Sequence, residues 1–532
     1  MERKTRVRFA PSPTGPLHMG GVRTALYNYL YAKQHGGDFI LRIEDTDSHR
    51  FVPGAEAYII EALRWCGIVP DEGVDADGKM VETASAQHPH APYRQSQRRA
   101  IYRQYAEQLV ENGYAYYAFD SAAALEERRA EAERAGQTFL YGLTTRDTLR
   151  NSLTLSAEET ERLLRETDSW TIRFKMPAHT VVKMDDLIRG HIEVNTDTLD
   201  DKVLWKRADE LPTYHLANIV DDHLMEITEV IRGEEWLPSL PLHYMLYKAF
   251  GWEDTMPRFA HLSLLLKPVG NGKLSKRDGD KMGFPVFPLQ WVNAEGETSH
   301  GYREDGYFPE AFVNMLAMLG WNPGTEQELF SMEELIQAFS LNKVQKAGAK
   351  FNPDKAKWYN REYLRAKRDE ELTDLFIPVL QEQGITVTGC PKCPVSADFA
   401  AKEFSWNYVR NVVALVKERA TFVRDFWTSA ACLFTAPAEF VQKDVDKFWK
   451  PEIKEQVRQA AAHLLDTGVS FEKETVGSSL EEYIRAQEWP MGKVMNALRL
   501  ALTGAASGLG IADILSFIGP EEFRARLSAA EM

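Results

Sequence analysis

Two segments of this 532-residue chain combine glycines with a histidine or with lysines, residue types that can bind phosphate groups. The first, PSPTGPLHMGG at residues 11–21, places His18 just before Gly20 and Gly21. Glycines at the start of a helix let a phosphate or a flat base approach the backbone N–H groups. His18 could then donate a hydrogen bond to charge that develops on the phosphate. A rigid turn that carries a surface histidine is the alternative.

The residues on either side of this segment predict how it is held. In TRVRFA, Val7 and Phe9 alternate with arginines, which is typical of a short strand. Apolar residues at helical spacing follow the turn as far as Gly36, and DFILRIEDTD then opens with a second strand. This strand–loop–helix–strand order indicates a parallel α/β sheet, in which ligands bind at the carboxyl ends of the strands. The turn matches neither the GxGxxG nor the GxxxxGK[ST] nucleotide motif.

The second segment, GKLSKRDGDKM at residues 272–282, carries four basic side chains next to glycines. By itself it is typical of a solvated basic loop. Together with residues 11–21, however, it resembles the paired HIGH and KMSKS signatures of the class I aminoacyl-tRNA synthetases. The two signatures read HMGG at residues 18–21 and KLSKR at residues 273–277 in this chain.

Further stretches narrow the resemblance to the bacterial glutamyl-tRNA synthetase family. They are RFAPSPTG (8–15), RIEDTD (42–47), APYRQS (91–96), DDLIRG (185–190) and LPTYHLANIVDDHLMEITEVIRGEEW (211–236). The resemblance is strong from about residue 6 to residue 365 and weaker beyond. One departure is YGLTTRDTLR at 141–150, where family members often have a YDxRCR-like stretch, so contacts there are not carried over.

The resemblance implies ATP-dependent activation of glutamate to glutamyl-adenylate, followed by transfer to the 3′ end of tRNA-Glu, with Mg²⁺ carried in by ATP. It implies catalytic roles for His18, Lys273 and Lys276, and no enzyme nucleophile, so that Ser275 is a loop residue. Contacts to ATP would come from His18, Gly20, Gly21, Glu235, Leu265, Lys273, Ser275, Lys276 and Arg277. Contacts to glutamate would come from Arg8, Ala10, Ser12, Glu44, Tyr214, Asn218 and Arg232.

Residue types agree with these roles. The forked guanidiniums of Arg8 and Arg232 suit the two carboxylates of glutamate, and the Glu44 carboxylate suits its ammonium group. Tyr214 and Asn218 are spaced i,i+4, so that both lie on one helical face and can hydrogen-bond the substrate. Taken singly, Arg8 fits a surface position on an edge strand, and Arg232 fits an ordinary salt bridge.

The charge distribution predicts where tRNA binds. The chain has a formal net charge of -15, which excludes a generally basic nucleic-acid-coating protein, so any contact must use local basic patches. Residues 341–368 carry nine basic side chains against Asp354 and Glu362, a local net charge of +7. We expect Lys343, Lys346 and Lys350 to contact tRNA phosphates. A solvated helix face is the alternative.

The expected fold is an α/β Rossmann-like parallel-sheet catalytic domain with an α+β insertion, followed by an all-α C-terminal region. The catalytic domain would occupy residues 1–112 and 211–290, the latter with the KLSKR loop, around an acceptor-end-binding insertion at 113–210 that is strand-rich near 170–204. Residues 291–365 would form a stem-contact junction domain. A helical anticodon-binding domain would follow at 366–532, with apolar helical spacing at 403–427 and 492–504.

Cysteine and acidic residues raise the question of metals. The four cysteines are too few for a disulfide framework, which fits a reducing cytoplasm. Cys390 and Cys393 have zinc-knuckle spacing, but no second ligand pair accompanies them, and no cysteine lies in the insertion, so no zinc is expected. For Asp221, Asp222 and His223, structural hydrogen bonding is favoured over a metal site.

The sequence predicts no membrane span, because no apolar run approaches the roughly 18 residues that a spanning helix needs. A monomer is also expected. Three alternatives to a glutamyl-tRNA synthetase differ from it in their sequence requirements. A glutaminyl-tRNA synthetase fits the PSPTG and VIRGEEW stretches less well. A truncated relative that modifies a tRNA base lacks the C-terminal domain, and the length of this chain argues against it. A catalytically inactive, synthetase-like tRNA-binding protein would not need His18, Lys273 and Lys276.

Overall fold

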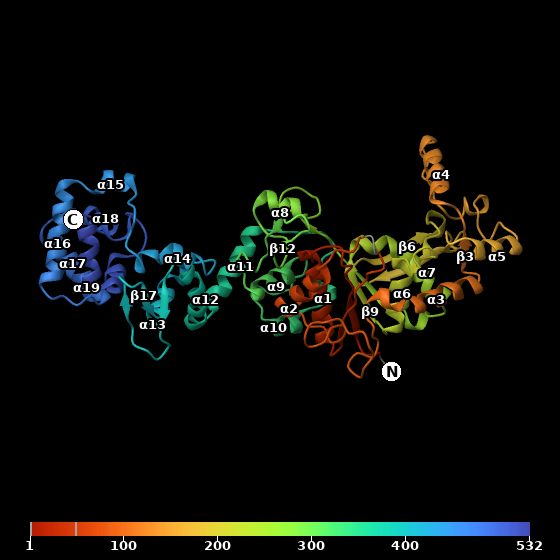
Figure 1. Cartoon of the computed structure of the whole chain (residues 1–532), viewed down its shortest axis with the longest axis horizontal. Coiled ribbons are helices and arrows are strands. Elements are labelled where there is room, and N and C mark those ends of the chain that lie inside the picture. The colour runs from red at the N-terminus through yellow and green to blue at the C-terminus, as the bar shows by residue number, and fades with distance from the viewer. Residues whose placement is uncertain (1–2, 48–49, 532) are drawn as a thin grey trace. The chain divides into compact units, whose positions relative to one another are not determined.

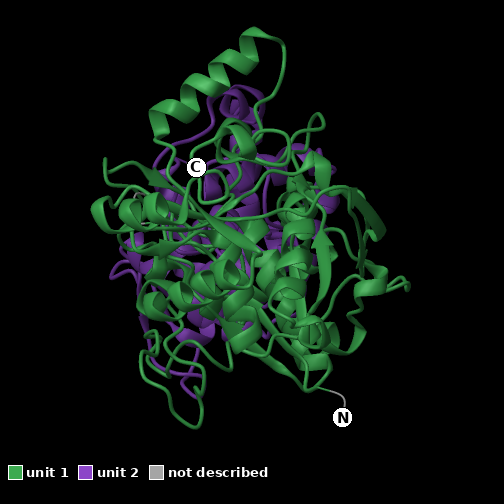
Figure 2. Ribbon diagram, turned by 90° about the vertical axis from the view of Figure 1, so that its right-hand side faces the viewer, with its two compact units in different colours: residues 1–359 green, residues 360–532 purple. Residues whose placement is uncertain are grey.

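The computed structural model describes residues 3–47 and 50–531. The chain forms two compact units, Met1–Tyr359 and Asn360–Met532 (Figure 2). Among the described residues, no helix is long and apolar enough to cross a membrane.

The first unit begins with the predicted strand–loop–helix–strand arrangement. Strand β1 (Arg6–Phe9) is fully buried and pairs in parallel with β2 (Asp38–Leu41), with Val7 opposite Phe39. Helix α1 (Met19–Gln34) connects them and buries Val22, Leu26 and Leu30. The loop at 10–18 therefore leaves the carboxyl end of β1 and enters the amino end of α1, which confirms this part of the sequence analysis.

A second sheet continues this arrangement, with strands in the order β6-β5-β10-β9. Strands β9 (Glu229–Gly233) and β5 (Val181–Asp186) both pair in parallel with β10 (Arg258–Leu262), and β6 (Gly190–Asn195) pairs antiparallel with β5. Next to β9, the N–H of Thr228 donates to the Arg6 carbonyl oxygen at 2.8 Å, so β9 lies beside β1. The carboxyl ends of β1, β9 and β10 consequently meet at one edge.

The region expected to be an insertion has its own antiparallel sheet, in the order β3-β4-β7-β8. Its β5–β6 hairpin joins β10 instead, through a parallel pairing of Asp186 with Phe259. Helix α4 buries no side chain. The other elements of this region are β3 (Ala115–Ala118), α4 (Ala122–Arg134), α5 (Ala157–Glu166), β4 (Thr171–Phe174) and β7 (Val203–Lys206) (Figure 1). Helix α3 (Arg99–Glu111) precedes the region, and β8 (Leu211–Pro212), the last strand of its sheet, lies just after residue 210.

The rest of the first unit is mainly helical, with two short two-stranded sheets. Strand β11 (Leu265–Leu266) pairs in parallel with β14 (Ala349–Lys350), and β12 (Trp291–Val292) pairs antiparallel with β13 (Thr298–Ser299). The helices are α2 (Ala55–Trp65), α6 (Tyr214–Leu224), α7 (Leu240–Ala249), α8 (Lys276–Met282), α9 (Pro309–Met318), α10 (Met332–Ala338) and α11 (Pro353–Ala366), which runs past the end of the unit.

The second unit is helical, as predicted, but it also contains a small sheet that the sequence analysis did not predict. Strands β15 (Thr386–Thr388), β17 (Glu403–Ser405) and β16 (Ala397–Asp398) lie in that order. The helices are α12 (Asp369–Glu382), α13 (Trp406–Val416), α14 (Asp425–Ala430), α15 (Gln442–Phe448), α16 (Pro451–Asp466), α17 (Lys473–Ala486), α18 (Met491–Thr503) and α19 (Ile511–Ala529).

Candidate active site

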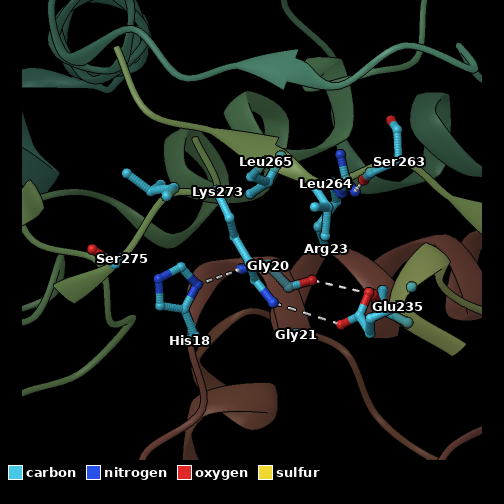
Figure 3. A pocket seen from close by; sticks show the side chains of 13 residues that line it. His18, Gly20, Gly21, Arg23, Glu235, Ser263, Leu264, Leu265, Lys273 and Ser275 are labelled. Carbon is cyan, nitrogen blue, oxygen red and sulfur yellow. Dashed lines mark hydrogen bonds and ion pairs between the residues drawn. The ribbon is translucent and has the colours of Figure 1, made fainter. Parts of the chain in front are cut away.

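A cavity of about 370 Å³ lies at the amino end of α1, beside the ends of β9 and β10 (Figure 3). Seven of the nine residues predicted to contact ATP line it. The lining residues are His18, Gly20, Gly21, Arg23, Thr24, Gly233, Glu235, Ser263, Leu264, Leu265, Lys273, Leu274 and Ser275. We call it the nucleotide cavity. Lys276 and Arg277, the other two predicted residues, do not line it and are exposed.

His18 is the N-cap of α1, and this position sets its tautomer. The backbone N–H of Gly20 donates to Nδ1 at 3.2 Å, so the ring proton belongs on Nε2. Nε2 is buried and has no hydrogen-bond partner among the described residues. Burial, aided by the Lys273 ammonium, lowers the pKa of His18 to about 4. His18 therefore holds a neutral, unsatisfied N–H donor at the helix amino end.

At two glycines of this cavity, an added Cβ would displace a neighbouring side chain. A Cβ on Gly21 would lie 2.6 Å from Leu17 Cδ1, and a Cβ on Gly233 would clash with the Glu235 carboxylate. Gly233 thus lets the Glu235 carboxylate fold back over the end of β9. Glu235 Oε1 in turn lies 3.9 Å from Lys273 Nζ, which brings the second predicted signature to the first.

The KLSKR segment is partly helical, whereas the sequence analysis treated it as a loop. Leu274 N–H donates to the Leu265 carbonyl at 2.8 Å, which fixes Lys273 beside β11. Helix α8 then begins at Lys276. The N–H and the hydroxyl of Ser275 both donate to Asp278 Oδ2, at 3.0 and 2.6 Å, and the Asp278 N–H donates to the Ser275 carbonyl oxygen at 3.1 Å. Ser275 is therefore a helix cap, and the capping geometry places Lys276 in the first turn.

A second cavity of about 230 Å³ adjoins the first. All seven residues predicted to contact glutamate line it. The lining residues are Arg8, Phe9, Ala10, Pro11, Ser12, Leu17, Gly21, Thr24, Glu44, Tyr214, Asn218, Ile231, Arg232, Gly233, Glu235 and Trp236. Gly21, Thr24, Gly233 and Glu235 line both cavities. We call it the amino-acid cavity.

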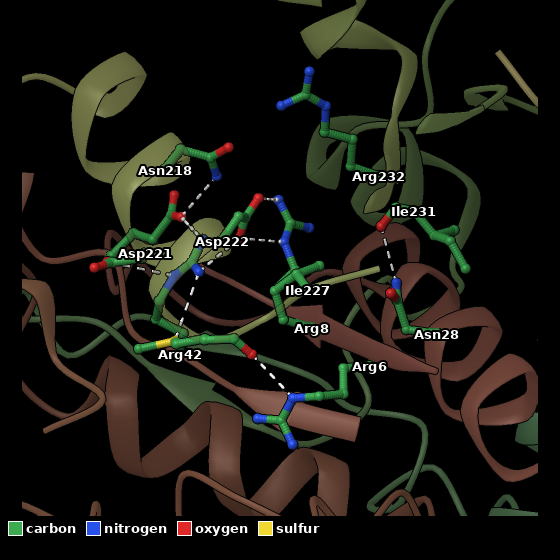
Figure 4. Close-up of polar contacts among 12 residues, drawn as sticks. Arg6, Arg8, Asn28, Arg42, Asn218, Asp221, Asp222, Ile227, Ile231 and Arg232 are labelled. Atoms are coloured by element: carbon green, nitrogen blue, oxygen red, sulfur yellow. Dashed lines mark hydrogen bonds and ion pairs between the residues drawn. The ribbon is translucent and has the colours of Figure 1, made fainter. Parts of the chain in front are cut away.

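One wall of the amino-acid cavity is a buried network of charges (Figure 4). Arg8 donates from Nε and Nη2 to both carboxylate oxygens of Asp222, at 3.0 and 3.2 Å. Arg42, which is fully buried, bridges Asp222 Oδ1 at 2.7 Å and Glu44 Oε1 at 2.9 Å. Although burial alone would raise it, the pKa of Asp222 is lowered by these two guanidiniums. Arg8 is thus neither exposed nor at an edge; its fork is held by a carboxylate.

Glu44 and Asn218 form the part of this wall that can receive an ammonium group. Asn218 Nδ2 donates to Glu44 Oε1 at 3.2 Å, while Asn218 Oδ1 is buried and has no partner among the described residues. Burial raises the pKa of Glu44, against the influence of Arg42 and Arg8. An ammonium group would supply the donors that Asn218 Oδ1 lacks and would favour the charged form of Glu44.

The neighbouring Asp221 has a structural role. It accepts hydrogen bonds from Arg98 at 2.8 Å, from Tyr102 at 2.7 Å and from Gln95 at 3.0 Å. Since Asp222 is also fully engaged, both acidic residues of the DDH stretch serve the hydrogen-bonding role that the sequence analysis favoured. His223 stacks on Trp252 at 3.7 Å.

Arg232 forms the opposite wall and is held differently. It donates from Nη1 to the Tyr214 hydroxyl at 2.7 Å and from Nε to His261 Nε2 at 3.0 Å, and Nη2 has only a 3.5 Å contact with the Trp236 carbonyl. No described carboxylate lies within 4.0 Å of its guanidinium. Arg8 and Arg42 balance Asp222 and Glu44, so the charge of Arg232 is left uncompensated beside the cavity.

The three lysines predicted to contact tRNA are all exposed. Lys343 Nζ donates to the Pro323 carbonyl, and Lys346 Nζ donates to the Arg189 carbonyl at 3.3 Å. Lys350 lies on β14, which pairs with β11, the strand that carries Leu265 of the nucleotide cavity. Because the acceptors are uncharged carbonyls, the positive charges of Lys343 and Lys346 are not neutralised.

Sequence reasoning missed several residues that shape the site. Thr24, Gly233 and Trp236 line one or both cavities, and Trp236 stacks on Tyr214 with ring centroids 4.1 Å apart. The VIRGEEW stretch contained two of these residues and was the available signal. Nothing in the sequence pattern pointed to His261, Asp222 or Asp186 as partners of the two arginines.

Two sequence matches show the family to which this site belongs. Residues 4–358 match tRNA synthetases class I (E and Q), catalytic domain, and residues 371–531 match an anticodon binding domain. The chain belongs to the class I tRNA synthetases of the E and Q group.

Individual relatives are more specific. The chain is 54% identical to a glutamate–tRNA ligase of Porphyromonas gingivalis strain W83, over 100% of this chain and 99% of that protein. It is 52% identical to a glutamate–tRNA ligase of Parabacteroides distasonis, over 99% of each. A crystal structure of a glutamate tRNA ligase from Elizabethkingia meningosepticum, in complex with its amino acid, matches with a TM-score of 0.90 at 50% identity over 99% of both chains.

Proposed function

We propose that the chain is a glutamate–tRNA ligase, which activates glutamate with ATP and transfers it to the 3′ end of tRNA-Glu. One observation carries this proposal. A cavity with a single uncompensated guanidinium, that of Arg232, opposite the Glu44–Asn218 pair, adjoins a cavity built on a helix amino end. Glutamate, with two carboxylates and one ammonium group, has the complementary net negative charge.

The first step joins the contents of the two cavities. A glutamate α-carboxylate oxygen attacks the α-phosphorus of ATP, and the bond to pyrophosphate breaks, giving glutamyl-adenylate. Arg8 and Arg232 hold carboxylates, and Glu44 with Asn218 holds the ammonium group. Gly21, Thr24, Gly233 and Glu235 border both cavities, so the reacting oxygen and phosphorus meet there.

The nucleotide cavity fits ATP through its unsatisfied donors. His18 Nε2–H and the Lys273 ammonium are available for phosphate oxygens, and Gly20 and Gly21 leave the helix amino end open. Lys276 and Arg277, exposed in the first turn of α8, would reach the phosphates from outside. Mg²⁺ enters as part of the ATP substrate, and no residue of the described chain is assigned to it.

In the second step the 2′-hydroxyl oxygen of the terminal tRNA ribose attacks the carbonyl carbon of the adenylate, and AMP leaves. No protein nucleophile is needed, in keeping with the role of Ser275 as a helix cap. Lys343, Lys346 and Lys350 would contact tRNA phosphates. We also propose that the enzyme acts as a monomer in the cytoplasm, in keeping with four cysteines present as free thiols.

A charging assay with purified protein, ATP, Mg²⁺ and tRNA-Glu tests the proposal. Glutamate should be esterified to the tRNA, and glutamine should not, because its uncharged amide leaves the Arg232 charge without a partner. Preferential charging of glutamine would favour a glutaminyl-tRNA synthetase. Retained tRNA binding without adenylate formation would mean an inactive synthetase-like protein.

A further inference from the structure

Behind Arg232, three neighbouring strands carry a buried chain of hydrogen bonds that no part of the proposed reaction uses. Arg232 on β9 lies directly opposite His261 on β10, and Asp186 ends β5 on the other side of β10. The Arg232 Nε–His261 Nε2 distance is 3.0 Å, and the His261 Nδ1–Asp186 Oδ2 distance is 2.6 Å. The side chains of His261 and Asp186 are both 0% exposed.

Donor chemistry fixes the proton positions in this chain. A guanidinium can only donate, so His261 Nε2 must be the acceptor and the ring proton must sit on Nδ1. Nδ1–H then donates to Asp186 Oδ2. Asp186 Oδ1 is separately occupied by the backbone N–H groups of Ile188 at 2.9 Å and Arg189 at 2.7 Å. Burial lowers the pKa of His261, which keeps the ring neutral.

The contrast with Arg8 shows what such a chain achieves. Arg8 is held by direct contact with a carboxylate, Asp222, which both orients it and neutralises its charge. Arg232 is instead oriented by a hydrogen bond to a neutral imidazole. Its other nitrogens contact the Tyr214 hydroxyl, the Trp236 carbonyl and His243, whose pKa burial lowers well below the usual value. Its full charge therefore stays available beside the cavity.

We propose that Asp186 and His261 are positioning residues for Arg232: the Asp186 carboxylate fixes the His261 tautomer, and that tautomer orients the guanidinium that receives a substrate carboxylate. The inference rests on the proposed function, since it takes glutamate as the occupant of the amino-acid cavity. It also gives the DDLIRG stretch a role, because its turn at Asp186–Arg189 is what orients the Asp186 carboxylate.

The substitution Asp186→Asn tests this by reversing one hydrogen bond. The Asn oxygen would remain with the N–H groups of Ile188 and Arg189, so the new NH₂ group would face His261 Nδ1. The ring proton would then move to Nε2, where it opposes Arg232 Nε–H. The matched control is Asp185→Asn, the same change at the preceding residue, whose side chain is 88% exposed.

Glutamate binding to the full chain is measured by calorimetry, and the His261 tautomer by ¹⁵N NMR of histidine-labelled protein. In the wild type we expect the proton on Nδ1. In Asp186→Asn we expect it on Nε2, a glutamate Kd raised by about 10-fold or more, and an ATP Kd within about twofold of wild type, by analogy with lost outer partners of metal ligands. Asp186→Asn removes a negative charge, which by itself would favour binding of the negatively charged glutamate. A weaker affinity therefore cannot come from the change in charge.

A second pair of variants retains Asp186. His261→Gln can place an amide oxygen near the position of Nε2 and should keep most of the glutamate affinity, whereas His261→Leu should lose it. If Asp186→Asn does not fold, the glutamate affinities of these two His261 variants test the inference. An unchanged glutamate Kd after the tautomer has moved, a wild-type proton on Nε2, or equal affinities of the Gln and Leu variants would overturn the inference. Absence of glutamate binding in the wild type would instead refute the proposed function.

Discussion

The amino-acid cavity and the nucleotide cavity adjoin, but the donor side chains of the first have several partners, whereas those of the second have few. In the amino-acid cavity, Arg8 and Arg232 each make at least two hydrogen bonds to other residues and are 3% and 5% exposed. In the nucleotide cavity, His18 Nε2 has no partner among the described residues, and the side chain of Lys273 is 62% exposed with one ion pair at 3.9 Å.

The difference follows from what each cavity has to do. Glutamate must be told apart from similar amino acids, and a guanidinium held in one orientation rejects a substrate that lacks the matching carboxylate. Negative charge develops on phosphate oxygens during adenylate formation, and a donor that has no partner beforehand can bind that charge without first breaking another hydrogen bond. The first cavity therefore needs rigid partners, whereas the second needs free ones.

The largest expected effect comes from removing an arginine of the rigid cavity. Arg232→Ala or Arg8→Ala should cost about 2–5 kcal/mol in kcat/KM for glutamate, as for other broken buried charge pairs. Glutamate is titrated in the charging assay at saturating ATP and tRNA. Arg165→Ala on α5, at a side chain 73% exposed, is the control.

The Arg8→Ala and Arg232→Ala variants should differ in their free energy of unfolding. Arg8→Ala leaves the buried Asp222 with Arg42 as its remaining partner, whereas Arg232→Ala leaves no carboxylate without its partner. Arg8→Ala should therefore unfold more easily than Arg232→Ala.

For the activity of these two variants, near-native kcat/KM in both would mean that glutamate binds elsewhere.

The next effect concerns the free donors. His18→Ala or Lys276→Ala should slow adenylate formation by about 100-fold or more, as expected when a transition-state donor is removed. Pyrophosphate exchange in the presence of tRNA measures this step, and calorimetry should give an unchanged glutamate Kd.

Lys281→Ala serves as the control, because Lys281 is exposed at the far end of the same short helix α8. A wild-type exchange rate in His18→Ala would remove the Nε2–H donor from the mechanism.

The contrast between the cavities also separates what the sequence could predict from what it could not. The β1–α1–β2 unit and His18 at its turn were predictable because strand alternation, helical spacing and paired glycines are local signals. The seven residues assigned to glutamate came from the family resemblance, and they line one cavity. The Ser275–Asp278 cap could have been read from its spacing, but the basic residues favoured a loop.

The partners of the arginines could not be predicted, because their contacts join distant parts of the chain. Arg8 and Asp222 are 214 positions apart, and Asp186 and His261 are 75 apart. Their pairing depends on the order β5-β10-β9 beside β1, which no local pattern encodes. Strands β15–β17 have two or three residues each, too short for a period-2 pattern to be detected.

A smaller effect is expected outside both cavities. Replacing Lys343, Lys346 and Lys350 together by Gln should weaken cognate and non-cognate tRNA by a similar factor, because phosphate contacts carry little sequence information. The slope of log K against log salt should become shallower by roughly 0.7–0.9 for each tRNA phosphate that a lysine no longer neutralises. Filter binding at several salt concentrations measures both.

The matched control replaces three other exposed lysines of the first unit, Lys4, Lys79 and Lys248, by Gln. Adenylate formation at saturating tRNA should survive in both triple variants. If affinity and salt slope stay at wild-type values, or fall equally in the control, residues 341–350 are only a solvated face.

The smallest effect is an expected absence of titration. An ordinary histidine gains a proton as the pH falls through about 6.5, but burial and Lys273 lower the pKa of His18 to about 4. Protonation would also put a proton on Nδ1, which accepts the Gly20 N–H. His18 should therefore remain a neutral Nε2–H donor, and its contribution to adenylate formation should be constant from about pH 8 down to pH 5.5. The ratio of wild-type to His18→Ala exchange rates isolates this contribution, because groups common to both proteins cancel. A ratio that changes with an inflection near pH 6.5 would mean that His18 titrates normally and acts as an imidazolium, so that the nucleotide cavity would depend on charge and not on a free neutral donor.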